Sequence, residues 1–344
     1  MWRGYGPALL LVVGCTRQGK GVDTAADPHL SDVATTADSD SLEETDQSGP
    51  VDTGTPPVPL AWVTVDMGTD IACGLLNDGR TVCWGHPDFL DLAPPSASVQ
   101  IAVGALEVCG LDDLGMVGCT CGNTQGDHNN TCEDVPVKAG HLELRSAAFW
   151  ACAERADHTL ACWGEGDQAT NAPTVPVSDW SIEENIGCAI LEDGTVTCWG
   201  TTENFNRWAP DAAIAPPADI TYVEVAVGRN HACALDIDGE VHCWGSTQVQ
   251  TAFPQATPGP WASITAWNAF TCGLRADGSA ECWHDMPGVS EVWIVPDEKW
   301  SSLGLGEWDA CGVTLDGRGL CFPEVSNGSG EQDIPDLADL VLPE

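Results

Sequence analysis

The residues best placed to do chemistry in this sequence are cysteines that occur in pairs, ten positions apart. One pair brackets an acidic stretch in "CALDIDGEVHCWG", residues 233–245. Two thiolates at such a spacing can bind a metal ion or form a redox couple, and in an oxidising compartment they form a disulfide. The first question is therefore whether these cysteines are reactive or structural.

The cysteine pair recurs along most of the chain. Successive first cysteines are separated by 36 to 45 residues, a period typical of propeller blades or a solenoid. Two further cysteines, Cys121 and Cys132, make an additional pair inside the second repeat. The seven pairs are Cys73 and Cys83, Cys109 and Cys119, Cys152 and Cys162, Cys188 and Cys198, Cys233 and Cys243, Cys272 and Cys282, and Cys311 and Cys321.

The residues between paired cysteines favour disulfides. In five repeats an Asp-Gly lies midway, as at Asp238-Gly239, and this is a strong hairpin signal. A turn there places the two cysteines opposite each other, with Cβ atoms about 4.5–5.5 Å apart, close to disulfide geometry. Without Cys15 the cysteines number 16, an even set. We therefore expect each cysteine to bond its partner ten residues on, and we interpret His158 in the third repeat as a turn residue with positive φ.

Two metal sites are alternatives to this structural interpretation. Asp236, Asp238 and Glu240 offer oxygen ligands for Ca²⁺, but the stretch lacks the further spaced carboxylates of a calcium loop. Cys119, Cys121 and Cys132 with His128 suggest zinc, whereas two neighbouring disulfides suit an oxidising compartment better. We expect no metal and no cofactor.

No segment matches a catalytic motif such as His-Glu-x-x-His, Gly-x-Ser-x-Gly or a phosphate-binding glycine loop.

Aromatic residues in the connectors between repeats are candidates for a recognition surface, because aromatics anchor interfaces. The alternative for these residues is packing between repeats. The candidates are Phe89, Phe205, Trp208, Phe253 and Trp293.

The elements that position these residues are short strands. Each repeat has an approach strand such as "YVEVAVG", the cysteine hairpin and a connector, often rich in proline, which gives three clear strands and a weaker fourth. Tryptophans after the second cysteine lie on the face opposite the disulfide, and we expect rings such as Trp244 to lie over small residues such as Ala234. Both hairpin faces are apolar, so both must be covered. The sequence therefore predicts an all-β, seven-bladed β-propeller with disulfides inside its hairpins.

The unit formed by an approach strand, "HACALDIDGEVHCWG" and a proline-containing connector resembles the repeat of the RCC1 superfamily. The resemblance covers about residues 61–325 and is closest to short-repeat bacterial members, which include a secreted β-lactamase-inhibitory propeller. It implies a seven-bladed propeller and, by analogy with that inhibitory member, a role as an enzyme inhibitor. The repeats depart from the pattern at "GCTCG" in the second, Trp283-His284 in the sixth and Cys321-Phe322-Pro323 in the seventh.

The N-terminal region differs from the repeats. Residues 1–14 have the layout of an export signal, and "LLVVGC" resembles a bacterial lipoprotein signal in which Cys15 would be lipidated. A cleaved secretory peptide is the alternative. Residues 15–60 are rich in Asp, Thr, Ser and Pro, so we expect a disordered tether before a propeller over 61–344. The expected location is extracytoplasmic, at the outer membrane or cell surface.

Charge and composition bound the function. Lys and Arg number 12 against 52 Asp and Glu, for a formal net charge of −40, which argues against nucleic acid as a partner. We expect a monomeric, non-enzymatic binding scaffold that recognises a protein or glycan through its loops and meets the membrane only through its lipid anchor. The alternatives are a hydrolase or lyase with its site in the central channel, and an inhibitor of a secreted enzyme. Exchange of guanine nucleotides, the role behind the family name, conflicts with export and many disulfides.

Overall fold

The computed structural model describes most of residues 59–323, and all of these residues belong to one compact unit, Val58–Glu344. Of the signal peptide and tether predicted over residues 1–60, residues 1–58 lie outside the described residues. Within the unit the described residues exclude 70, 86–91, 106, 123–131, 133, 165–166, 185, 201–215, 218, 230, 246–258, 285–294, 307–308 and 324–344.

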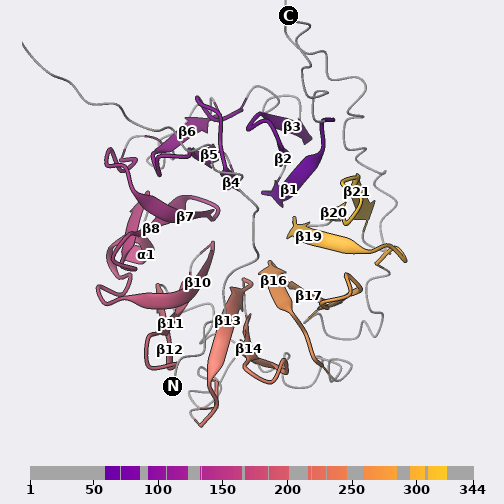
Figure 1. Ribbon diagram of the computed structural model, residues 1–344. Coiled ribbons are helices and arrows are strands. Elements are labelled where there is room, and N and C mark those ends of the chain that lie inside the picture. The colour runs from indigo at the N-terminus through magenta and orange to yellow at the C-terminus, as the bar shows by residue number, and fades with distance from the viewer. Residues whose placement is uncertain are drawn as a thin grey trace, which may run out of the picture. The chain divides into compact units, whose positions relative to one another are not determined.

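The described residues form seven antiparallel sheets of three strands each, arranged around a common axis (Figure 1). In each sheet the approach strand is innermost, and the two strands of the cysteine hairpin follow outward (Figure 1). This confirms the predicted propeller of seven blades. The blades are, in order, β1 (Trp62–Met67), β2 (Ile71–Leu76) and β3 (Thr81–Gly85); β4 (Gln100–Val103), β5 (Glu107–Leu111) and β6 (Val117–Cys121); β7 (His141–Ser146), β8 (Trp150–Arg155) and β9 (Leu160–Gly164); β10 (Val177–Glu183), β11 (Ile186–Leu191) and β12 (Val196–Gly200); β13 (Tyr222–Val227), β14 (His231–Asp236) and β15 (Val241–Gly245); β16 (Ser263–Trp267), β17 (Phe270–Leu274) and β18 (Ala280–His284); and β19 (Trp300–Leu305), β20 (Asp309–Thr314) and β21 (Gly319–Pro323).

Each hairpin turns at the position that the sequence indicates. In the first blade Gly79 has a φ of 86°, and its N–H donates to the carbonyl of Leu76 at 2.9 Å. This conformation is strained for residues with a side chain, which explains the recurring glycine. His158 holds the equivalent place in the third blade with a φ of 62°, as predicted. The turn sets the register that brings Cys73 opposite Cys83, and the same pairing recurs in every blade.

Neighbouring blades pack face to face, and every interface joins unlike faces. Between the fourth and fifth blades, Cys188 and Ile190 from one disulfide face meet Ala232, Trp244 and Tyr222 from the next blade's tryptophan face. A comparable buried cluster lies at each of the other interfaces. Both apolar faces of a hairpin are thus removed from water, and this burial is the main driving force for folding such a small sheet.

The tryptophans after the second cysteine lie over the small residue that precedes the first cysteine, as Trp199 does over Gly187, and not over the one that follows it. The ring that covers Gly74 belongs to Trp62 of the approach strand, whose Cζ3 would lie 2.3 Å from an added Cβ. Trp84 instead lies opposite Ala72, the residue before the cysteine, and meets Trp62 edge to face at 6.0 Å. Likewise Trp244 lies opposite Ala232, whereas Ala234 faces His242. The approach strand supplies the missing ring because it, too, places a large side chain on that face.

The ring closes where the seventh blade packs against the first. Strand β1 contacts β19 and β20, and Cys311 and Val313 pack against Trp62 in one buried cluster. An added Cβ at Gly304 would lie 2.7 Å from the carbonyl oxygen of Val65, so the two inner strands approach closely there. Residues 324–344, which follow β21, lie outside the described residues.

The weaker fourth strand is not seen in the described part of the connectors. After β9 the described residues form a short helix, α1 (Asp167–Thr170), and then irregular structure up to β10. The other connectors are described in part or not at all. Each sheet therefore has three strands in the described chain, rather than the four expected.

Candidate functional site

The predicted recognition residues cannot be placed. Phe89, Phe205, Trp208, Phe253 and Trp293 all lie outside the described residues. The same holds for Cys15 and for His128, the histidine of the alternative zinc site. The candidate surface in the connectors thus stays a prediction.

The cysteines of the propeller are bonded, so their thiols are not available for chemistry. All seven hairpin pairs form disulfides, with a separation of 4.0 Å between the Cα atoms of Cys233 and Cys243, for example. The eighth bond joins Cys121 and Cys132, whose Cα atoms are 6.2 Å apart. These bonds confirm the predicted pairing and remove the sulfur ligands of the alternative zinc site. Among the described residues no group of three or more His, Cys, Asp or Glu side chains has the geometry of a metal site.

The candidate calcium-binding residues of the fifth blade, Asp236, Asp238 and Glu240, lie in the hairpin turn, where Asp236 bonds the backbone. Asp236 Oδ1 accepts hydrogen bonds from the N–H groups of Asp238 and Glu240, both at 2.9 Å, and Oδ2 lies 2.8 Å from His242 Nε2. These bonds lower the pKa of Asp236 against the opposing effect of burial. Asp238, to which the sequence assigns the turn, has an exposed side chain without a hydrogen bond in the described chain. The carboxylate that holds the turn is therefore Asp236.

This difference between two neighbouring aspartates predicts different costs of substitution. Asp236→Ala should lower the free energy of unfolding by about 1.5–3 kcal/mol, because two turn amides lose a charged acceptor. Asp238→Ala should change it by about 0.5 kcal/mol or less, as for other surface positions. Urea denaturation followed by tryptophan fluorescence measures both. Equal losses in the two variants would contradict the assignment.

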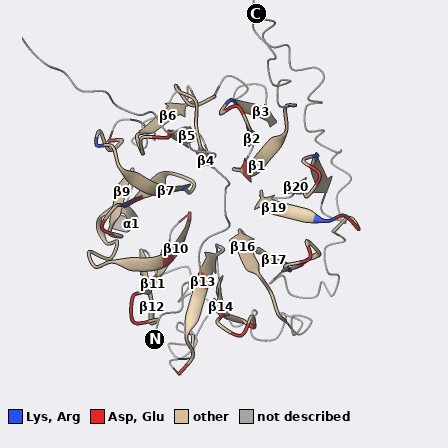
Figure 2. Cartoon of the chain, in the orientation of Figure 1, with Lys and Arg blue, Asp and Glu red and all other residues tan. Residues whose placement is uncertain are grey.

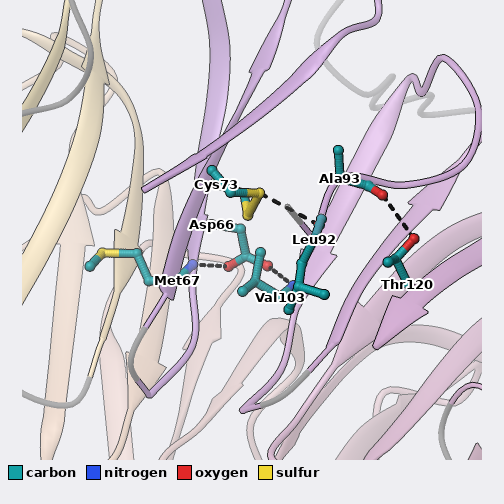
Figure 3. The surroundings of a disulfide bond; sticks show 8 residues. Asp66, Met67, Cys73, Leu92, Ala93, Val103 and Thr120 are labelled. Carbon is teal, nitrogen blue, oxygen red and sulfur yellow. Dashed lines mark hydrogen bonds between the residues drawn. A yellow bond between two sulfur atoms is a disulfide. The ribbon is translucent and has the colours of Figure 1, made fainter. Parts of the chain in front are cut away.

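Polar side chains on the inner strands link one blade to the next. Asp66 on β1 accepts a hydrogen bond from the N–H of Val103 on β4 at 2.8 Å, beside the disulfide of the first blade (Figure 3). Gln100 on β4 bonds both the N–H and the carbonyl of Leu144 on β7, each at 2.9 Å. The inner strand of each blade has an edge with no strand beside it, and these side chains satisfy its exposed backbone groups.

Three carboxylates at one register position continue this arrangement. Glu143, Asp179 and Glu224 each stand on an inner strand opposite the residue two places after the first cysteine. Asp179 accepts from Val225 N at 2.6 Å and Glu224 from Ile264 N at 3.1 Å, in each case on the next blade. The inner carboxylates of the fourth and fifth blades thus serve as links between blades.

Arg145 is the cation of this cluster. Its guanidinium lies 2.7 Å from Glu143 and 3.4 Å from Asp179, and its Cζ is 5.2 Å from the centroid of the Trp180 ring. Burial raises the pKa of Asp179 to about 6, and burial together with the charge of Asp179 raises the pKa of Glu224 to about 7. A carboxyl that is half protonated near neutral pH is a feature of acid-base sites and also of buried structural groups.

Two more titratable groups are buried where the inner strands end. Glu183 is 3% exposed, and burial and the neighbouring Glu184 raise its pKa to about 8. His231 is fully buried, which lowers its pKa to about 4, and its Nε2 lies 2.7 Å from Thr271 Oγ1 on the next blade. The carboxyl of Glu183 accepts a hydrogen bond from the backbone of Asn268, while its Oε2 has no hydrogen-bond partner in the described chain.

Among the described residues, the large apolar side chains that are exposed lie at one end of the blades. We call this the turn end: the hairpin turns lie there and the inner strands begin there, as shown by the hydrogen bond from Ile237 N to the carbonyl of Thr221. Those in the hairpin turns are Leu114, Ile237 and Leu315, with exposures of 69%, 67% and 64%. The others stand at the start of inner strands or in the connectors that lead into them, namely Val63, Val99, Val137, Leu142, Val175 and Val223.

Sequence reasoning missed the inner carboxylates and the exposed apolar residues. A sequence signal for the inner carboxylates was present, because approach strands such as "WVTVDM" and "YVEVAV" place a carboxylate among alternating apolar residues. The exposed apolar residues could not be found from the sequence, because single valines and leucines are common in turns and only the fold shows that these lie at one end of the blades. No helix in the described chain has the length and apolar character needed to cross a bilayer.

Comparison with known proteins agrees with this architecture. Residues 222–248, which hold the fifth blade, match the family model described as the regulator of chromosome condensation (RCC1) repeat. The CRINKLY WD40 ectodomain of the Arabidopsis thaliana receptor kinase ACR4 has a similar structure, with a TM-score of 0.60 and 20% identity over 77% of this chain and 96% of that one.

Two further solved structures share the fold. The ectodomain of the Physcomitrella patens receptor kinase CR4 has a TM-score of 0.60 and 20% identity, over 77% of this chain and 75% of that chain. Prp20p from Saccharomyces cerevisiae, described with its binding to Gsp1p and histones, has a TM-score of 0.53 and 14% identity, over 70% and 80% of the two chains. Similarity at these identities establishes the propeller fold, and the family-model match over residues 222–248 supports the RCC1-like repeat.

Proposed function

We propose that this chain, a seven-bladed propeller with RCC1-like repeats, is a binding scaffold that recognises a protein or glycan outside the cytoplasm through the turn end of its blades. The observation that carries the proposal is the gathering of exposed large apolar side chains at that end. Apolar residues grouped on one surface of a soluble protein are typical of interaction sites. A propeller fold also suggests a binding scaffold, as in Prp20p, which is described with its binding partners.

The inner strands support binding over catalysis. The carboxylates Asp66, Asp179 and Glu224 each hold a backbone N–H of the neighbouring blade, and Asp179 also pairs with Arg145. Groups committed to such contacts are poorly placed to move protons on a substrate.

The proposed location rests on the disulfides and the N-terminal sequence. Eight disulfides in one chain suit an oxidising compartment, and the "LLVVGC" sequence suits lipidation at Cys15. The scaffold would then be held at the outer membrane or cell surface by acyl chains alone. The net charge of −40 favours a monomer and disfavours nucleic acid as a ligand.

Affinity capture tests the proposal. The bait is the full chain with Cys15→Ser, which removes the lipid, exposed to envelope fractions and to a glycan array. We expect a specific partner that is lost with the triple variant Leu114→Ser, Ile237→Ser, Leu315→Ser and kept with Arg229→Ala, a substitution in the loop between β13 and β14, at the other end of the fifth blade. If the triple variant still captured the partner, the recognition surface would lie outside the turn end. If the wild-type bait captured no partner, the scaffold proposal would lose its support.

A hydrolase is the second candidate, and the carboxylate cluster around Arg145 is the observation that favours it. Glu224, with its pKa raised to about 7, would be the acid, and Asp179 the second carboxylate. Hydrolysis of a glycoside or ester panel by the wild type, abolished in a folded Glu224→Gln variant, would establish this activity. Inhibition of a secreted enzyme is a form of the scaffold proposal and would appear as capture of that enzyme.

A further inference from the structure

The turn end is not uniform, and one sector of it combines exposed apolar residues with carboxylates that form no ion pair within the described part of the chain. This sector, the blade 4–5 patch, consists of Glu192, Asp193, Val223, Ile237 and Asp238. All five side chains are exposed. The two turns are neighbours because Thr221 contacts both: its Cγ2 would lie 3.4 Å from a Cβ at Gly194, and its carbonyl accepts from Ile237 N at 3.1 Å.

The carboxylates of this patch differ from those of equivalent turns elsewhere. In the seventh blade Asp316 pairs with Arg318 at 2.9 Å, and in the sixth Asp277 pairs with Lys299 at 2.7 Å. In the first blade Asp78 pairs with Arg80. No ion pair between described residues involves Glu192, Asp193 or Asp238. From β10 to β15 the one described Lys or Arg is Arg229, in the loop between β13 and β14, where it pairs with Glu184.

The bonding inside the two turns keeps these charges facing solvent. Asp193 accepts from the N–H and hydroxyl of Thr195, which lowers its pKa and keeps it ionised. In the fifth blade the turn N–H groups donate to Asp236, so the turn does not depend on the Asp238 carboxylate. Figure 2 shows the acidic residues along the β11–β12 and β14 hairpins. Ile237 directly precedes Asp238 in the turn and is 67% exposed.

We infer that the blade 4–5 patch is the docking site for a cationic polypeptide segment that places an apolar side chain against Ile237 and Val223 and lysines or arginines against Asp193 and Asp238. This inference rests on the proposed function and identifies the chemistry of its partner. A polypeptide fits better than a neutral glycan because the patch presents unneutralised carboxylates around an apolar centre. A second copy of this chain is disfavoured, since two copies would bring the same carboxylates together.

The seventh blade supplies a matched control. Leu315 occupies the same turn position as Ile237 and is exposed to nearly the same extent, 64% against 67%. Asp316 and Asp238 likewise share a position, but Asp316 is paired with Arg318. Ile237→Ser and Leu315→Ser therefore remove nearly equal exposed apolar surface. Asp238→Asn and Asp316→Asn each remove one charge, which is paired with a cation only at Asp316 in the described chain.

The test measures binding of a short fluorescein-labelled peptide of lysine and leucine to the full chain by fluorescence anisotropy. We expect Ile237→Ser to weaken binding about tenfold, as for an interface anchor. Asp193→Asn with Asp238→Asn should weaken it about threefold to tenfold in low salt, and less in high salt because the charges are screened. Leu315→Ser and Asp316→Asn should leave it unchanged. A peptide of glutamate and leucine should not bind.

Several outcomes overturn the inference. Equal losses of peptide affinity in the Ile237 and Leu315 variants, or an affinity that is the same in low and high salt, would show that the charges of the patch do not determine where the peptide binds. Self-association removed by Ile237→Ser in sedimentation experiments would make a second copy the occupant. Capture of a cellular partner that survives Ile237→Ser but is lost in the triple turn variant would leave the scaffold standing and reject this patch. An empty capture would reject the scaffold itself.

Discussion

Removing the disulfide of a hairpin should destabilise the propeller more than removing the disulfide of a connector. We expect the double variant Cys233→Ala, Cys243→Ala to lose about 3–5 kcal/mol of unfolding free energy. About 2.5–3 kcal/mol of this arises from the freedom that the unfolded chain regains when a loop of this length is opened. The remainder arises from packing, because Cys233 is fully buried among Leu235, Trp261 and Trp283.

The control is the double variant Cys121→Ala, Cys132→Ala. This bond closes a loop of almost the same length, 11 residues against 10, but both of its cysteines are only half-buried. The loss should therefore be about 2.5–3 kcal/mol, from chain entropy alone. Chemical denaturation with mass spectrometry of the remaining disulfides measures both. A connector variant that is destabilised as strongly as the hairpin variant would show that the packing of Cys233 contributes nothing.

Most of the fold could be predicted because its determinants are local. Cysteine spacing and the Asp-Gly turn fix the register within each hairpin, and that register places Cys73 opposite Cys83 in the structure. Apolar residues on both hairpin faces require neighbours on both sides, which leads to stacked blades. The error about Trp244 and Ala234 arose where the determinants are no longer local, since the approach strand places its own ring over the position after the cysteine, as Trp62 does over Gly74.

The candidate site was harder to predict because it depends on which segments meet. Asp179 is one acidic residue of many until the next blade places Val225 N at its carboxylate. Ile237 is an ordinary turn residue until the blades align its turn with that of Asp193. The connectors that carry the predicted aromatic surface differ most between repeats, so the repeat pattern says nothing about their conformation.

The buried carboxyls predict that the propeller is more stable in mild acid than in mild alkali. The pKa values of Asp66 and Asp179 rise to about 6, that of Glu224 to about 7 and that of Glu183 to about 8, in every case chiefly through burial. Their unfolded values lie near 4, so between pH 4 and pH 8 the folded chain holds more protons than the unfolded chain. Stability therefore falls as the pH rises through this window.

Other groups act in the opposite direction at the acid end. Burial lowers the pKa of His231 to about 4, which costs stability as the pH falls from about 6.5 towards 4. The turn aspartates, among them Asp193, have lowered pKa values and lose their contribution as the pH falls below about 4. Four buried carboxyls outweigh one histidine, so the maximum of stability should lie near pH 5.

Glu224→Gln separates this effect from general changes with pH. The amide oxygen of glutamine can still accept from Ile264 N, while the group no longer ionises beside Asp179 and Glu143. We expect the variant to match the wild type within about 0.5 kcal/mol at pH 5 and to exceed it by about 1–3 kcal/mol at pH 8, since one pKa unit corresponds to about 1.4 kcal/mol. Glu192→Gln, an exposed control, should leave the profile unchanged. Urea titrations at a series of pH values measure this, and a wild type whose stability rises from pH 5 to pH 8 would show that the ionisation of buried carboxyls does not govern the pH dependence of folding.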